Sequence, residues 1–117
     1  MIMKLTNNNG LTFSFLENGN VQNIDADKIR INLKPGNLFA QPGTQIYLRK
    51  RTGNSIEFTS LTGMNNEIAI SDNQFASKGN WNGIEYVCTL QLSEKSSSWQ
   101  WKIDVANNST ENVELDV

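Results

Sequence analysis

The chain has 117 residues, of which 38% are hydrophobic and 19% charged, and this composition is typical of one soluble globular domain. Ten Lys and Arg against twelve Asp and Glu give a net charge of -2, so the electrostatic signature of a general nucleic-acid binder is missing. Histidine is also missing, which excludes catalytic sites of the Ser-His-Asp and Cys-His types and metal sites that depend on histidine.

Apolar and polar residues alternate along the first part of the chain, as they do in half-buried strands. Residues 11–16 and 21–25 form two such runs, joined by Asn18-Gly19, a dipeptide typical of tight hairpins. A third run over residues 29–33 stops at Pro35-Gly36, since proline cannot donate a hydrogen bond to a strand ladder. This part of the chain therefore predicts a hairpin followed by a third strand.

The same alternation continues to the end of the chain, with turn sequences between the runs. Helical spacing is not kept for three turns in any window. Many short strands at this spacing predict an all-β fold, an antiparallel β-sandwich over residues 1–117 that is part of a larger sandwich. The remaining strand runs are residues 45–51, 55–61, a weaker one at 67–70, 75–81, 84–92, 99–106 and 113–117.

The alternation of apolar and polar residues also predicts which side chains share a face of the sheet. Trp99, Trp101, Ile103 and Val105 occupy every second position and are predicted to face the core together. Cys88 is in phase with its apolar neighbours, so it is predicted to be a buried and unreactive thiol.

Two charged clusters are candidate sites. Asp25 and Asp27 are spaced to share a strand face as a carboxylate pair for acid/base chemistry or cation binding, although an ordinary turn is the favoured interpretation. Arg49 and Arg51 share one face and leave Lys50 on the other, an arrangement suited to a phosphate or an acidic partner. The favoured interpretation of this basic cluster is that it guards a strand edge.

One aromatic turn is a candidate binding site. Trp81 lies between Asn80 and Asn82 in a predicted turn. An exposed indole ring stacks on the apolar face of a sugar, while neighbouring amides bind its hydroxyls. These three residues are the candidate carbohydrate contact, and a tryptophan that closes the open end of the sandwich is the alternative. Neither a catalytic residue nor a metal ligand is predicted.

A series of blocks carries a family resemblance. The blocks are Leu11-Thr-Phe-Ser-Phe-Leu-Glu-Asn-Gly19, Ile24-Asp-Ala-Asp27, Ile29-Arg-Ile-Asn-Leu33, Ile46-Tyr-Leu-Arg-Lys-Arg51, Gly83-Ile-Glu-Tyr86, Thr89-Leu-Gln-Leu92, residues 101–105, Asn107-Asn-Ser109 and Val113-Glu-Leu-Asp116. In this order they resemble the opening of β-1,2-oligoglucan phosphorylases and of related cyclic β-1,2-glucan synthases, in glycoside hydrolase family 94. These blocks span nearly the whole chain, but each consists mostly of residues typical of strands and turns and carries no catalytic chemistry.

The resemblance implies a role within a larger enzyme. Members of that family begin with a β-sandwich and continue into an (α/α)6 barrel, which holds the general acid and the phosphate site. This chain would then be a non-catalytic N-terminal segment of a phosphorylase, a glycosyltransferase that uses inorganic phosphate as co-substrate, and would need no cofactor itself. Its implied partners are the remaining domains, a second copy in a homodimer and a β-glucan. A free-standing carbohydrate-binding or interaction module is the alternative.

The ends of the chain and its cysteine content indicate where the protein is expected to be located. The start Met1-Ile2-Met3-Lys4 lacks the apolar stretch of a signal peptide, and no run approaches the roughly 18–20 apolar residues of a membrane helix. Cys88 is the single cysteine, so a reducing cytoplasm is the expected location. The final run stops at Val117 in mid-strand, which leads us to expect further polypeptide. Neither a membrane nor a nucleic acid is an expected partner.

Overall fold

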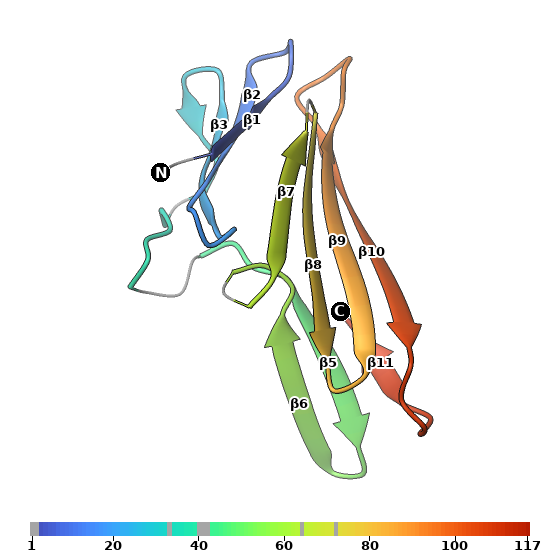
Figure 1. The fold of residues 1–117 in the computed structure, drawn as a ribbon. Helices are drawn as coiled ribbons and strands as arrows, with labels where there is room; N and C mark the ends of the chain where they lie inside the picture. Colours follow the sequence, from blue (N-terminus) through green and yellow to red (C-terminus); the bar gives the residue numbers. More distant parts are fainter. Residues whose placement is uncertain (1–2, 33, 40–42, 64, 72) are drawn as a thin grey trace.

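The computed structural model describes residues 3–32, 34–39, 43–63, 65–71 and 73–117. Every regular element in these ranges is a β-strand, and all strand pairs are antiparallel, so the predicted all-β antiparallel fold is confirmed. The strands form three sheets (Figure 1): a long sheet that runs the length of the molecule, an N-terminal sheet and a small sheet.

The long sheet contains the clearest strands of the sequence. In spatial order its strands are β10 (Trp99–Asn107), β9 (Ile84–Leu92), β8 (Gln74–Trp81) and β7 (Glu67–Ser71). Buried and more exposed residues alternate along the whole of β9, as the sequence predicts. The β8–β9 turn is tight because Asn82 and Gly83 both adopt positive φ angles, of 53° and 87°, which these two residue types tolerate.

The N-terminal sheet differs from the prediction at both of its edges. Its strands are β1 (Met3–Thr6), β2 (Leu11–Phe15), β3 (Val21–Ala26) and β4 (Ile29–Arg30). β1 was not predicted, because four residues are too few to display alternation. The predicted run 29–33 is wrong in length: the Asn32 side chain accepts a hydrogen bond from the Ile24 N–H at 2.7 Å and so takes the place of a ladder bond. Leu33 lies outside the described residues.

The small sheet joins two distant parts of the chain. In spatial order its strands are β11 (Glu114–Asp116), β5 (Tyr47–Thr52) and β6 (Ser55–Ser60). The sequence predicted the β5–β6 hairpin and a strand at the end of the chain. It did not predict that this last strand pairs with β5, where Leu115 lies opposite Lys50.

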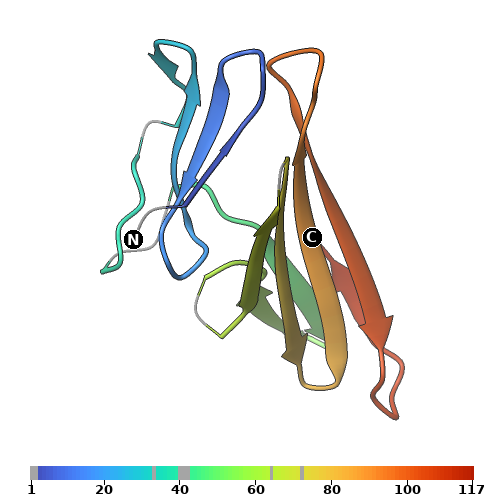
Figure 2. The same cartoon turned by 45° about the horizontal axis from the view of Figure 1, so that its top comes forward.

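The N-terminal sheet and the small sheet pack on the long sheet side by side (Figures 1 and 2), and each covers its own hydrophobic cluster. Trp101 of β10 is packed against both clusters. The cluster under the N-terminal sheet consists of Leu5, Leu11, Phe13, Phe15, Val21, Ile24, Phe75, Leu90 and Leu92. The cluster under the small sheet consists of Leu48, Leu61, Ile84, Tyr86 and Cys88.

Candidate functional site

The candidate carbohydrate contact lies at the β8–β9 turn. Trp81 is half-buried and packs against the cluster under the small sheet. The Asn80 Oδ1 accepts a hydrogen bond from the Gly83 N–H at 3.2 Å, and Asn82 supplies the positive φ that closes the turn. Each of the three residues therefore has a structural role here, and a sugar contact stays a prediction.

Of the two candidate aspartates, Asp25 lies near the end of β3 and Asp27 lies in the β3–β4 turn. Asp25 pairs with Arg30, with 3.0 Å between the Asp25 Oδ1 and the Arg30 Nε, and Asp27 holds the turn with a φ of 56°. This geometry agrees with the turn interpretation. Among the described residues, no group of three or more Cys, Asp and Glu side chains is placed to hold a metal ion. Within the same part of the chain, no helix has the length and apolar character needed to cross a membrane.

The basic cluster is a structural clamp and does not guard an edge. β5 is the central strand of the small sheet, so the favoured interpretation of the sequence is wrong. The Arg49 Nε and Nη2 donate to the two Asp116 carboxylate oxygens at 2.6 and 3.0 Å, and Arg51 donates from Nη2 at 3.1 Å. The hydrogen bond from Arg49 is the main cause that lowers the pKa of Asp116. The clamp holds β11 against β5.

Cys88 is buried and unreactive in its setting. Its side chain is inaccessible to solvent, and burial raises the pKa of the thiol to about 11. A thiol with such a pKa is almost entirely protonated at neutral pH, whereas the thiolate is the nucleophile. The predicted buried thiol is confirmed.

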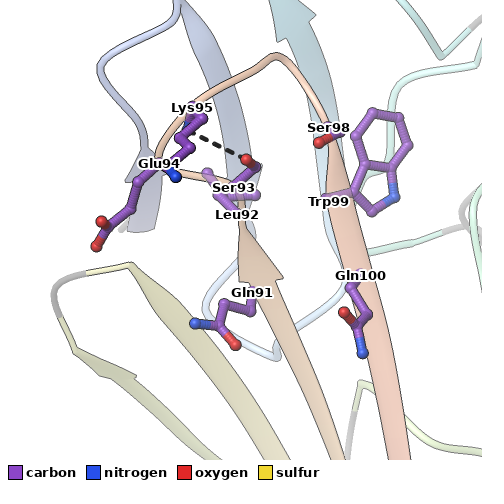
Figure 3. A pocket seen from close by; sticks show the side chains of 8 residues that line it. All are labelled: Gln91, Leu92, Ser93, Glu94, Lys95, Ser98, Trp99 and Gln100. Carbon is purple, nitrogen blue, oxygen red and sulfur yellow. Dashed lines mark hydrogen bonds between the residues drawn. The ribbon is translucent and has the colours of Figure 1, made fainter.

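A hollow of about 510 Å³ lies beside the β9–β10 turn (Figure 3). Polar groups that line this hollow form hydrogen bonds within the turn, where the Lys95 N–H donates to the Ser93 Oγ at 3.1 Å. The Asn7 Nδ2 fixes the same turn from the N-terminal sheet by donating to the Ser93 carbonyl at 2.7 Å. We assign no ligand to this hollow. It borders the start of β10, the strand that carries the strongest candidate site.

Among the described strands, β10 forms an edge of the long sheet (Figure 1), and it is only partly covered. Its apolar residues share the inner face, as predicted, but Trp99 is 36% and Val105 42% exposed. Trp99 contacts Phe13 of the covering N-terminal sheet edge-on, with 5.2 Å between the ring centroids. Trp101 contacts Phe75 edge-on at 6.4 Å, and Phe75 belongs to β8 of the long sheet itself. The row therefore faces the core as predicted, but its two ends at Trp99 and Val105 are open to solvent.

The backbone of β10 also presents hydrogen-bonding groups on the side where no described strand pairs with it. The Ser93 N–H donates to the Ser98 carbonyl and the Asn108 N–H to the Gly83 carbonyl, at opposite ends of a β9–β10 ladder of constant register. Hydrogen-bonded pairs recur at every second residue of an antiparallel ladder, so the even-numbered residues of β10 bond to β9. The N–H and C=O groups of the odd-numbered residues consequently point away from β9, toward the open edge.

The outer face of β10 carries two charges of opposite sign. Lys102 and Asp104 are both exposed, and 3.6 Å separates the Lys102 Nζ from the Asp104 Oδ2. β10 thus combines backbone groups that face an open edge, a partly covered apolar row on one face and a charged pair on the other. Sequence reasoning identified the apolar row but missed this site, because alternation does not show which strand lies at an edge.

A family model described as the SOGP N-terminal domain matches residues 14–117. The match is to a different family from the one expected, and nothing found points to glycoside hydrolase family 94. We correct that expectation, and with it the expected roles as a glucan phosphorylase segment and as a carbohydrate-binding module. A search of curated proteins gives no match.

Proposed function

We propose that this chain, which belongs to the SOGP N-terminal domain family, is a non-catalytic docking domain that accepts an extended polypeptide strand along β10. The observation that carries the proposal is the half-open flank of β10, where an apolar row and unpaired backbone groups lie on the same nine-residue strand. Natural proteins protect such edges with short strands, bulges or proline, because an open edge is a template for pairing. β10 is long and pairs with β9 without a register shift.

The chemistry of the incoming strand follows from the two faces of β10. Side chains directly opposite one another in an antiparallel pair lie on the same face. An added strand therefore needs apolar residues beside Trp101, Ile103 and Val105, and polar or charged residues beside Lys102 and Asp104. Backbone hydrogen bonds provide the affinity in this mode of recognition, and the alternate side chains provide the specificity.

The non-catalytic part of the proposal is supported by how the reactive groups are used. The thiol of Cys88 is buried, and the carboxylate of Asp116 is held by two arginines that secure a strand. A reducing cytoplasm is the location we propose, because the buried free thiol of Cys88 needs no disulfide partner there.

A labelled peptide that copies residues 99–107 tests strand acceptance, because it has the required alternation and leaves the chain unmodified. Saturable binding, measured by fluorescence anisotropy, is the expected result. A peptide with N-methyl groups at the positions of Trp101 and Ile103 should not bind, since these amides would face β10. The matched control carries its N-methyl groups at the positions of Lys102 and Asp104, whose amides face away, and it should bind like the parent peptide.

Absence of saturable binding by the parent peptide would overturn the proposal. Equal binding of the two methylated peptides would overturn it as well, because it would show that the peptide does not pair with β10 through its backbone.

A further inference from the structure

Two charges of opposite sign flank Ile103 in the sequence of β10. Lys102 precedes this residue and Asp104 follows it, both on the outer face. If β10 pairs with an antiparallel copy of itself and Ile103 lies opposite Ile103, each Lys102 lies opposite Asp104 of the other copy. The inner face is also matched, because each Trp101 then lies opposite Val105 of the other copy.

We propose that the strand accepted by β10 is β10 of a second copy of this chain, paired about a two-fold axis at Ile103. This inference rests on the proposed function and names its partner. The backbone geometry agrees with it: the odd-numbered residues present their N–H and C=O groups to the open edge, and in this register odd residues meet odd residues. The two long sheets become one continuous sheet.

The charges favour this register over the two neighbouring registers. Only registers that keep odd residues opposite odd residues preserve the hydrogen bonds. The nearest such register in one direction places Lys102 opposite Lys102, and the nearest in the other direction places Asp104 opposite Asp104. Like charges directly opposite one another destabilise a strand pair, whereas opposite charges stabilise it. The register centred on Ile103 also pairs the full length of β10.

The exposed apolar surface of β10 is available to a strand of a second copy. Val105 is 42% exposed on the free chain, and a neighbouring strand with its own apolar row would cover it. The exposed ion pair of each copy, with 3.6 Å between Nζ and Oδ2, becomes part of a group of four alternating charges. Such charges contribute specificity and register more than affinity.

Variants in which the charge of Lys102 or Asp104 is reversed test the pairing, and the mass of the chain in solution is the measurement. Sedimentation equilibrium at low salt, with chain concentrations up to about 1 mM, should show a species of twice the 13.1 kDa chain mass. Lys102→Glu places like charges opposite one another twice, and so does Asp104→Lys, so each variant alone should dissociate about 10- to 100-fold more readily. An equimolar mixture of the two variants restores both opposite-charge pairs and should form a heterodimer of near wild-type strength. Lys78→Glu, on the same outer face but on the interior strand β8, is the matched control and should dimerise normally.

The outcomes separate this inference from the proposed function. A wild-type chain that stays monomeric while the 99–107 peptide binds would overturn the second copy as partner and leave strand acceptance standing. A dimer that is insensitive to both charge reversals, or a mixture that does not recover, would overturn the register. A monomeric chain that also fails to bind the peptide would overturn both proposals.

Discussion

The stack of Phe15 on Phe75 joins the N-terminal sheet to the long sheet, and its removal tests how strongly the two sheets depend on each other. Both side chains are 0% exposed, and the ring centroids lie 4.1 Å apart with the ring planes inclined by 3°. Phe75→Ala removes a fully buried ring, so the free energy of unfolding should fall by about 3–5 kcal/mol. This is a large share of the roughly 5–15 kcal/mol that is typical of a domain.

A double-mutant cycle separates stacking from simple burial. Phe15→Leu and Phe75→Leu both keep an apolar side chain, and their coupling energy should be about 0.5–1.5 kcal/mol, because aromatic pairs add this much beyond area burial. Phe75→Leu combined with Leu48→Val is the control, since Leu48 belongs to the cluster under the small sheet. These two changes should be additive within about 0.5 kcal/mol.

Urea unfolding followed by tryptophan fluorescence and by circular dichroism measures both quantities. The two probes should give coincident transitions if the sheets unfold together. An unchanged urea midpoint for Phe75→Ala, or a coupling energy of zero between Phe15→Leu and Phe75→Leu, would refute the reasoning.

The remaining predictions concern Cys88 and the Asp116 clamp. The Cys88 thiol should not react with an aromatic disulfide reagent at neutral pH until denaturant is added, since burial raises its pKa to about 11; prompt reaction of the folded chain would contradict this. The arginines lower the pKa of Asp116 in the folded chain below its pKa in the unfolded chain. They therefore stabilise β11 fully at any pH above the unfolded pKa, and this stabilisation is lost as the pH falls through the folded pKa. Amide chemical shifts of residues 114–116 should therefore move toward random-coil values as the pH is lowered to about 2, and Asp116→Asn should show such shifts at neutral pH; constant shifts in both experiments would show that the clamp does not hold the strand.

Most strands could be predicted because local signals agree with the tertiary structure. β9 shows the alternation of a strand with one buried face, and its bounds match the predicted residues 84–92. The turns carry residues that accept positive φ angles, such as Gly19 at 88° and Gly83 at 87°. A sequence in which propensity, periodicity and turn chemistry agree specifies its strands locally.

Other features could not be predicted, because they depend on partners that are distant or unusual. The short strand β4 ends where the Asn32 Nδ2 donates to the Gln22 carbonyl at 3.0 Å, so a side-chain amide substitutes for the backbone of a longer strand. The pairing of β11 with β5 joins residues more than sixty positions apart, and it is held by the Asp116 clamp and by the packing of Leu115 against the cluster under the small sheet. Neither contact has a local signature in the sequence.

The candidate site depends on this same distinction between local and tertiary information. Alternation places Ile103 on the inner face, but whether that face is covered depends on how far two other sheets extend across the long sheet. Lys102 and Asp104 look like an ordinary solvated face for as long as the neighbours of β10 are unknown. Once β10 lies at an edge with the odd-numbered backbone groups free, the order of these two charges determines which registers another β10 can adopt. The charge pattern therefore becomes informative about a partner only after the fold shows that the strand lacks one on that side among the described strands.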